Sequence, residues 1–404
     1  MKLLRLTTAY DAYLLSFYAK RPELSGASYD AQQRELYLDA FGWADYWAHA
    51  LAPLGWQVVN VTANAEPLQM AWARDAGFVP EESNWVLEIA REQVRRFAPD
   101  VLFMDDYNSF PAAWIRRLRE ACPSIRLVLG WCGAPYENGE VFRAYDVVLS
   151  CIPEMVEDFQ SKGHTAYHLN HAFDERLVER VVGGRRDIDL SFIGTVGAGA
   201  QAHTRRFELL SRLSKETSIQ IYGPETRHVS ALRWARFVLF WVAYKKGVPL
   251  HKLPFVRQRL AGKRVPASIS ILDLFRVPRS PIPGMLPPVF GMDMLRVLAR
   301  SKLSLNAHTD ISPRSASNMR LYEATGMGAC LVTDWKSNLR ELFEPDGEVV
   351  AYRSAGECVE KANWLLEHPA ESARIAEAGR QRTLRSHTYR HRAPLLDELI
   401  RAHM

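Results

Sequence analysis

The stretch NMRLYEATGMGACLVTD, from Asn318 to Asp334, combines features that neither a surface helix nor a core helix requires. A single acid, Glu323, follows an apolar pair, and two glycines precede the apolar run Cys330–Asp334. Glycines weaken a surface helix, and a lone carboxylate is costly inside a core. The pattern therefore predicts a short helix whose acid points into a cleft, then a tight turn and a buried strand.

Strand and helix patterns alternate through both halves of the chain. Short apolar runs bounded by turn or cap residues are interspersed with amphipathic stretches such as Trp85–Phe97. This spacing predicts doubly wound parallel sheets of the α/β class. The expected strands cover residues 3–7, 56–61, 100–106, 125–131, 146–151, 165–170, 189–195, 218–223, 302–308, 330–334 and 348–352.

A break near residues 181–189 divides the chain, because VVGGRRDID there is typical of a linker. The strand–helix pattern then restarts, which predicts two similar Rossmann-like sheets facing each other across a cleft. The length of 404 residues agrees, since a single core rarely grows so large. We therefore expect a first domain at 1–182, a second at 183–385, and a C-terminal helix at 386–404.

Composition excludes several classes of protein. A hydrophobic content of 48% argues against disorder. The five cysteines contain no CxxC pair, which favours reduced core thiols over a zinc site or a disulfide framework. The start MKLLRLTTAYDAY is too polar for a signal peptide, and no run reaches the ~20 apolar residues of a membrane span. These features predict a cytoplasmic protein.

One segment is strongly basic. Residues 227–272 contain ten Lys and Arg and no Asp or Glu, whereas the whole chain carries only +5. Within it, ALRWARFVLFWVAYKKG (231–247) has an apolar body with cationic flanks. Two interpretations stay open: an in-plane helix that binds an anionic membrane surface through 227–264, and a hairpin inserted at about 227–288 that packs on the second domain. No stacking motif accompanies the charge, so we expect no nucleic-acid partner.

The acid on the 318–323 helix has a chemical use. In open α/β sheets, ligands bind beyond the carboxyl ends of the strands, and the strand 302–308 ends just before this helix. There, Glu323 would accept hydrogen bonds from the adjacent hydroxyls of a ribose, while Gly326 and Gly328 close the helix end. A solvated helix acid followed by an incidental glycine turn is the alternative.

The region around this helix resembles a known family. It contains R-x-x-E-A, a following glycine, T-D, E-L-F and H-T-Y-x-x-R, a combination similar to the C-terminal half of group-1 glycosyltransferases. The greatest similarity is to the branch named after a spore-maturation protein, and it spans roughly residues 190–395. The elements are Arg320, Glu323, Ala324, Gly328, Thr333, Asp334, 341–343, 387–389 and Arg392.

This resemblance implies the GT-B fold, in which the second domain binds a nucleotide sugar and the first binds the acceptor. It implies sugar transfer to a glycan, lipid-linked or protein acceptor, and a final helix that returns to the first domain. A fixed guanidinium can stabilise a diphosphate leaving group without a metal or other cofactor. The residues implied to bind the nucleotide sugar are Gly194, Thr195, Arg205, Asn318, Arg320, Glu323 and Gly328.

The chain departs from the family at one position. Retaining members of the wider group carry a second Glu eight positions before the ribose acid, and here that position is Ser315. The resemblance therefore leaves the choice between retention and inversion open.

An inverting reaction needs a base within hydrogen-bond reach of the acceptor hydroxyl. Asp11 follows the first strand in a loop expected to face the cleft, and it is the leading candidate. The other candidates are Asp45, Asp105 and His171, each of which also has a structural explanation. The pair Asp187 and Asp189 has the D-x-D spacing of a metal site, but it lies at a linker–strand junction where alternation on a strand explains it, so we expect no metal site.

Two other functions are considered. A Rossmann oxidoreductase would need G-x-G-x-x-G, and GTVGAG (194–199) has the wrong spacing. A catalytically idle nucleotide-sugar binder is compatible with Ser315. Donor base, sugar and acceptor are not specified by the sequence.

Overall fold

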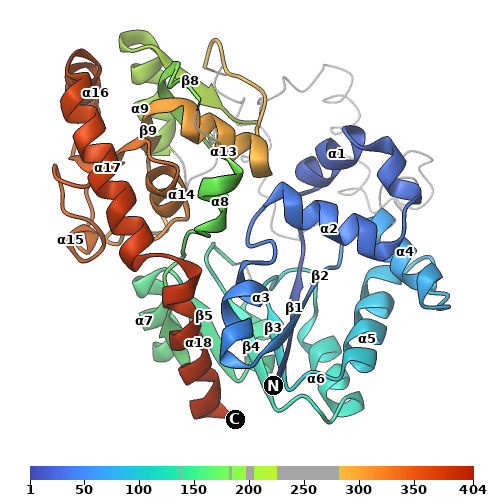
Figure 1. Cartoon of the computed structure of the whole chain (residues 1–404). Helices are drawn as coiled ribbons and strands as arrows, with labels where there is room; N and C mark the ends of the chain where they lie inside the picture. Colours follow the sequence, from blue (N-terminus) through green and yellow to red (C-terminus); the bar gives the residue numbers. More distant parts are fainter. Residues whose placement is uncertain (137, 182–183, 197–203, 225–281) are drawn as a thin grey trace, which may run out of the picture.

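A computed structural model describes residues 1–136, 138–181, 184–196, 204–224 and 282–404 (Figure 1). Two parallel sheets, each covered by helices, form two lobes that contact each other. The predicted α/β architecture with two doubly wound domains is therefore confirmed. Most of the basic segment 227–288, including the suggested membrane helix, lies outside the described residues.

The first sheet has six parallel strands in the order β2-β1-β3-β4-β5-β6. Its central strands are buried on both faces, which explains their continuous apolar sequence. The strands are β1 (Lys2–Thr7), β2 (Gln57–Thr62), β3 (Val101–Met104), β4 (Leu127–Trp131), β5 (Val147–Ser150) and β6 (Ala166–His168).

The second sheet has five parallel strands in the order β11-β10-β9-β7-β8. In both sheets the order in which successive strands are added reverses beside the first strand, as in doubly wound sheets. The strands are β7 (Ile188–Ile193), β8 (Ile219–Tyr222), β9 (Ser301–Asn306), β10 (Cys330–Asp334) and β11 (Val350–Tyr352).

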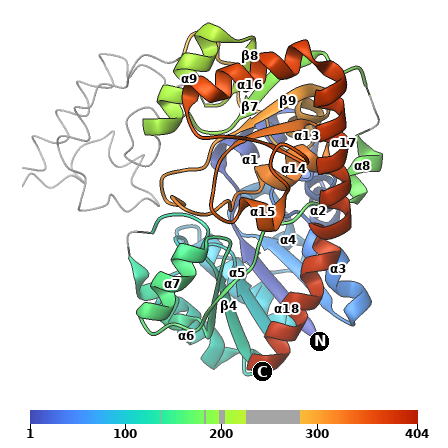
Figure 2. The ribbon, with the colours of Figure 1, turned by 90° about the vertical axis from the view of Figure 1, so that its left-hand side faces the viewer.

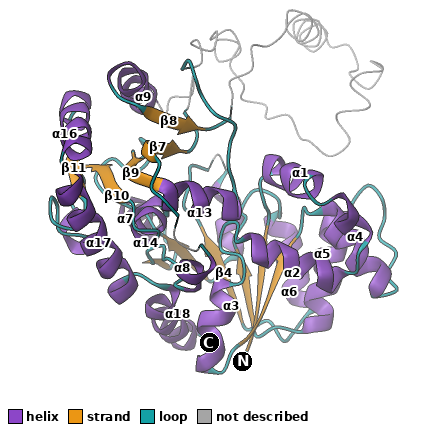
Figure 3. Cartoon of the chain, turned by 45° about the horizontal axis from the view of Figure 1, so that its top comes forward, coloured by secondary structure: helices purple, strands orange, loops and turns teal. Residues whose placement is uncertain are grey.

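Helices cover both faces of each sheet, as Figure 3 shows. The amphipathic stretch predicted at Trp85–Phe97 is α5, which buries Ile89 and Val94 against the first sheet. In the first lobe the helices are α1 (Asp11–Ala19), α2 (Tyr29–Asp39), α3 (Tyr46–Leu51), α4 (Glu66–Asp75), α5, α6 (Ala112–Ala121) and α7 (Pro153–Ser161), with α8 (Arg176–Arg180) leading to the second. In the second they are α9 (Thr204–Glu216), α13 (Gly291–Arg300), α14 (Arg320–Gly326), α15 (Leu339–Leu342), α16 (Ala355–Glu367) and α17 (Pro369–Ser386).

The last helix, α18 (Tyr389–His403), runs from the second lobe down along the first (Figure 2). It packs on α3, and Asp397 accepts a hydrogen bond of 2.7 Å from the Trp56 indole. At the crossing, the amide of Phe173 donates to the carbonyl of His387 at 2.9 Å, and the amide of Tyr389 donates to Phe173 at 3.1 Å. The two chain segments that join the lobes are therefore hydrogen-bonded to each other.

The carboxyl edges of the two sheets face each other. Glu154 is the second residue of α7, the helix that follows β5, so it lies at the carboxyl edge of the first sheet. Its Oε1 accepts a 2.9 Å hydrogen bond from the backbone amide of Arg314, which follows β9 in the second sheet. Because ligands of doubly wound sheets bind at this edge, the seam between the lobes is where a site is expected.

All five cysteines are buried and unpaired, which agrees with their prediction as core thiols. Within the ranges that the structure describes, no helix is both long and apolar enough to cross a membrane.

Candidate functional site

Glu323 lies on the first turn of α14, in contact with Arg320 of the same helix. Its Oε2 is 2.9 Å from Arg320 Nη1, and the two side chains are 14% and 16% exposed. Burial and nearby carboxylates, Asp174 and Glu323 among them, raise the pKa of Tyr46 on α3. The Glu323 carboxylate is therefore neither in open solvent nor in a dry core; it lies at the seam, near the first lobe.

Arg320 extends from α14 towards α13. Its Nη1 lies 3.1 Å from the Met294 sulfur, and its Nε is buried without a hydrogen-bond partner among the described residues. A thioether is a weak acceptor, so the guanidinium retains unused donor capacity. A ligand oxygen at the seam would satisfy it.

Asn318 connects the loop before α14 to the strand ends. Its Nδ2 donates to Asn306 Oδ1 at 2.6 Å, and Asn306 Nδ2 donates to Thr333 Oγ1 at 2.9 Å. Asn318 Oδ1 is buried and accepts no hydrogen bond within the described structure. The amide is thus fixed at the ends of β9 and β10 with one acceptor still available.

A histidine and an aspartate brace this loop. His308 Nδ1 lies 2.7 Å from Asp334 Oδ1, and the amide of Ser317 donates to His308 Nε2 at 3.2 Å. Nε2 therefore accepts, and the protonated Nδ1 donates a hydrogen bond to Asp334. Burial tends to raise the pKa of Asp334, but His308 and Lys336 outweigh it and lower the pKa to about 2.

Sequence reasoning did not identify His308 or Arg206 as site residues. Arg206 on α9 donates to the carbonyl of Thr195 at 3.1 Å and also to that of Ala307. It therefore ties the loop after β7 to the loop after β9. The sequence analysis named its neighbour Arg205, which the structure places in an exposed position on the same helix.

Gly194 and Thr195 follow β7 at the carboxyl edge, as expected. A side chain on the neighbouring Gly223 would lie 2.5 Å from the Gly194 carbonyl, so the backbones after β7 and β8 approach closely. Thr195 is exposed beside this close approach. Both residues stay candidates for contact with a diphosphate.

Gly328 lies elsewhere. It closes the turn after α14 with a φ of +74° and precedes β10, so it is at the amino edge of the second sheet. Its neighbours are the side chains of Arg186 and Arg380. In this position Gly328 serves the turn, which a left-handed backbone requires, and its contact with a nucleotide sugar stays a prediction.

Ser315, where the family acid is absent, is buried beside a carboxylate from the other lobe. Burial tends to raise the pKa of Glu154, but hydrogen bonds from its own amide, from Ser315 and from Arg314 hold that pKa below its usual range. Glu154 Oε2 is buried without a partner among the described residues. Its position after the apolar strand 146–151 was the only sequence signal for it, and the sequence analysis missed it.

Two of the candidate bases are paired with arginines. Asp105 lies 2.6 Å from Arg5, and Asp45 lies 2.8 Å from Arg176. Burial raises the pKa of Asp105, while Arg5 opposes that shift. A carboxylate committed to an arginine accepts a substrate proton poorly, so these positions favour the structural explanation.

His171 lies between two tryptophans, with its ring 5.9 Å from Trp43 and 5.2 Å from Trp131. Burial, and then Arg392, lower its pKa to about 3. Because a general base works best with a pKa near the working pH, His171 is also a poor catalyst. Asp11 is different: it is the exposed first residue of α1, just beyond the carboxyl end of β1.

The D-x-D carboxylates lie away from the site. Asp187 pairs with Arg300 and Asp189 pairs with Lys302, each at 2.6 Å, at the amino end of β7. In the part of the chain that the structure describes, no cluster of three or more His, Cys, Asp or Glu is arranged to hold a metal ion.

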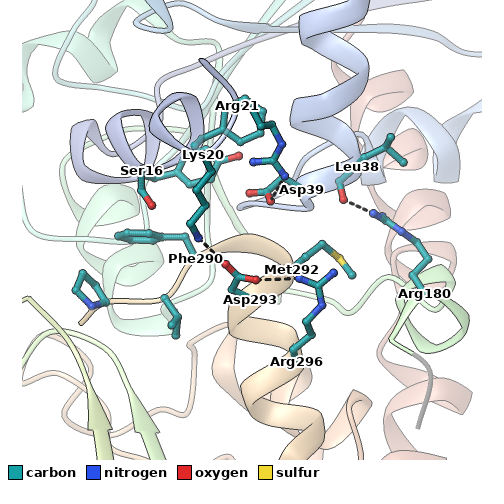
Figure 4. Close-up of a pocket in the computed structure, with 14 residues that line it drawn as sticks. Ser16, Lys20, Arg21, Leu38, Asp39, Arg180, Phe290, Met292, Asp293 and Arg296 are labelled. Atoms are coloured by element: carbon teal, nitrogen blue, oxygen red, sulfur yellow. Dashed lines mark hydrogen bonds and ion pairs between the residues drawn. The ribbon is translucent and has the colours of Figure 1, made fainter. Parts of the chain in front are cut away.

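A cavity of about 640 Å³ opens on the seam (Figure 4). Its walls come from α1, from the end of α2, from Arg180 at the end of α8, and from the start of α13. Glu323 is not part of its lining, so it is a compartment separate from the α14 site.

Residues 205–398 match the family model described as "Glycosyl transferase-like". The second half of the chain is therefore similar to glycosyltransferases. No curated protein sequence matches the chain.

Solved structures share the GT-B fold of this chain at low identity. Sucrose-phosphate synthase from Thermosynechococcus elongatus has 12% identity and a TM-score of 0.54, covering 100% of this chain and 98% of its own. A glycosyltransferase from Rickettsia africae has 9% identity and a TM-score of 0.52, covering 100% and 98%. Anabaena HepE in complex with UDP-glucose has 11% identity and a TM-score of 0.52, covering 100% of both chains.

Proposed function

We propose that this protein is a glycosyltransferase that moves a sugar from a nucleotide-sugar donor to a glycan, lipid-linked or protein acceptor, without a metal ion. The observation that carries the proposal is the position of the Glu323 carboxylate, which lies at the seam within 2.9 Å of Arg320. The solved complex of HepE with UDP-glucose, which has the same fold, supports a nucleotide sugar as the donor class.

The donor nucleotide would lie along the carboxyl edge of the second sheet. Glu323 would accept hydrogen bonds from the vicinal hydroxyls of the ribose, and the free Asn318 Oδ1 would accept another from the donor. The buried Nε of Arg320 would donate to a ligand oxygen, and it has no competing partner among the described residues. The diphosphate would approach Gly194 and Thr195, where the backbone is accessible.

The leaving group needs positive charge because a departing diphosphate gains negative charge in the transition state. Arg320 and the exposed Arg205 supply guanidinium groups on the two helices that follow β9 and β7. Guanidinium groups bind phosphate oxygens in a fork geometry and need no metal. We therefore assign charge stabilisation to these side chains.

The first domain would bind the acceptor, with Asp11 as the general base if the reaction inverts. Of the four candidate bases, Asp11 combines exposure with a position at the carboxyl edge. Glu154 is the carboxylate that reaches Ser315, so it is a candidate contact for the donor sugar if the reaction retains. Anomeric analysis of the product would distinguish these two assignments.

The finer classification is also a proposal. The sequence elements around Glu323 support the branch named after a spore-maturation protein, and a cytoplasmic enzyme on the inner membrane face is consistent with residues 227–264. Flotation of the full chain with anionic vesicles at low salt tests the membrane contact, and absence of the protein from the vesicle fraction would end that idea.

Calorimetric titration of the full chain with UDP, GDP, TDP and CDP tests the donor proposal. We expect one of the four to bind at least tenfold more tightly than the others (~1.4 kcal/mol), since the base pocket discriminates while the ribose and phosphate contacts are shared. The matching nucleotide sugar should then be hydrolysed slowly without an acceptor and without added metal. Failure of all four to bind would refute the proposed function.

A further inference from the structure

The seam cavity lies on the acceptor side of the proposed donor site. One wall of the cavity is the start of α13 in the second lobe. Helices of a doubly wound sheet start at its carboxyl edge, where ligands bind. Met294, one turn into the same helix, contacts Arg320 at 3.1 Å. The opposite wall is formed by α1 and α2 of the first lobe. At about 640 Å³, the cavity has the size of a small-molecule site.

Positive charge exceeds negative charge in the lining. Four cations (Lys20, Arg21, Arg180 and Arg296) face two carboxylates (Asp39 and Asp293), as Figure 4 shows. Asp293 is shared by two of these cations, since it lies 2.6 Å from Lys20 and 2.8 Å from Arg296. The Lys20 pair also joins the two lobes across the cavity.

The two remaining cations differ in how far they are neutralised. Arg21 lies 3.3 Å from Asp39 and 3.8 Å from Glu35, so carboxylates compensate its charge. Arg180 donates to the backbone carbonyl of Leu38, and no carboxylate among the described residues pairs with it. A carbonyl carries no net charge, so Arg180 brings an uncompensated positive charge to the cavity wall.

Two further features favour an anion. The Tyr13 hydroxyl is buried in the cavity wall beside the Asp39 carboxylate, where it makes no hydrogen bond of full geometry within the described structure, and the residue is only 3% exposed. The ten-residue α13 begins at Gly291 without a side-chain cap, so the positive end of its dipole is directed at the same space. An oxygen-rich anion would satisfy both groups.

We propose that this cavity is the acceptor subsite and that it recognises a phosphate group on the acceptor. The unpaired charge of Arg180, together with Arg296, which shares its carboxylate with Lys20, complements a phosphate monoester, which carries about −1.5 to −2 at neutral pH. Arg180 and Arg296 would bind the phosphate oxygens, and Tyr13 would donate to one of them. The inference rests on the proposed function, because it assigns the ligand as the sugar acceptor. The phosphate can belong to a soluble sugar phosphate or to a lipid-linked carrier.

Titration calorimetry of the full chain distinguishes a soluble sugar phosphate from a lipid-linked phosphate. The probes are glucose 6-phosphate, glucose, and phosphatidylcholine vesicles with and without a polyprenyl phosphate. We expect either glucose 6-phosphate to bind and glucose not to, or only the vesicles with polyprenyl phosphate to bind. The first result assigns a soluble acceptor, and the second assigns a lipid-linked one.

The variants Arg180→Gln and Arg296→Gln should each weaken the phosphate probe about tenfold, which is the loss of one charge-assisted hydrogen bond. The matched control is Arg300→Gln, at the other end of α13, where the arginine has a similar ion pair but does not line the cavity. The control should leave binding unchanged. Melting curves verify that all three variants fold.

Equal binding of phosphorylated and unphosphorylated probes, or equal affinity of the Arg180→Gln variant and the control, would overturn the inference. A separate titration with the four nucleoside diphosphates keeps the two proposals apart. Nucleotide binding without phosphate-probe binding refutes the acceptor subsite alone. Phosphate-probe binding that depends on Arg180 but occurs without any nucleotide binding refutes the donor proposal and leaves a phosphate site.

Discussion

Replacing Glu323 with glutamine removes the negative charge at the seam but keeps the length and shape of the side chain. The carboxylate accepts from Arg320 at 2.9 Å and, in the proposed donor complex, from two ribose hydroxyls. An amide has only one oxygen, so Glu323→Gln retains at most part of these contacts. The variant therefore tests the function of the carboxylate without creating a cavity.

The magnitude follows from the contacts that are lost. A hydrogen bond to a charged group contributes about 1.5–3 kcal/mol. Losing most of two such bonds, with partial replacement by the amide oxygen, should cost roughly 2–4 kcal/mol of binding free energy, or a 30-fold to 1,000-fold rise in Kd. The weakened pair with Arg320 should lower the free energy of unfolding by about 1 kcal/mol, so the variant stays folded.

Calorimetry with a ribonucleoside diphosphate and its 2′-deoxy analogue makes the test specific. The wild type should prefer the ribose form by about tenfold, because the deoxy form leaves part of the carboxylate unpaired. In Glu323→Gln this preference should fall below about threefold. An unchanged preference, or an unchanged Kd for the ribose form, would show that the carboxylate does not hold the diol.

Three further outcomes are expected. Asp105→Asn should lower the free energy of unfolding by about 3–5 kcal/mol in urea titration, because it leaves the buried Arg5 unpaired; a change below about 1 kcal/mol would contradict this. His171, with a pKa of about 3, stays neutral in the fold while the unfolded chain takes up a proton near pH 6.5, so stability should fall as pH drops from 6.5 towards 3. His171→Phe should remove up to about 1.4 kcal/mol per pH unit from that slope, and equal slopes would refute the assignment. Gly326→Ala should cost about 1–3 kcal/mol, since its methyl would lie 2.6 Å from the Phe173 ring; an unchanged melting curve would show that this contact relaxes freely.

Gly184→Ala is the control for the last of these. A methyl group there meets no atom within 4 Å, so the substitution should leave stability nearly unchanged. A loss equal to that of Gly326→Ala would indicate a general effect of the glycine change instead of overpacking.

The sequence pattern predicted helices and strands accurately where an amphipathic or apolar stretch was long. The expected helix Trp85–Phe97 and the expected strand Cys330–Asp334 have the same bounds in the structure. The expected strand 100–106 ends earlier, at Met104, because the next two acids serve other contacts. Asp105 pairs with Arg5, and Asp106 accepts from the amides of the following loop.

The site was predictable only in part. Glu323 stood out because its position behind a strand end and before a glycine turn is a local pattern. The pair of Glu154 with Arg314 joins residues 160 positions apart, which no local pattern reveals. Arg206 and Arg205 differ by one position, and one position on a helix rotates a side chain by about 100°. Periodicity therefore cannot decide which of the two faces the strand ends.

The return of α18 to the first lobe affects synthesis of the chain. The ribosome finishes the strands and tryptophans of the first domain long before it makes Tyr389, whose ring packs 5.0 Å from Trp47, or Asp397, which binds Trp56. Until then, the face of α3 that α18 covers is open to water and to other nascent chains. Because domains emerging from the ribosome fold in order and their exposed apolar surface invites aggregation, this early half is most prone to aggregate before the last helix arrives.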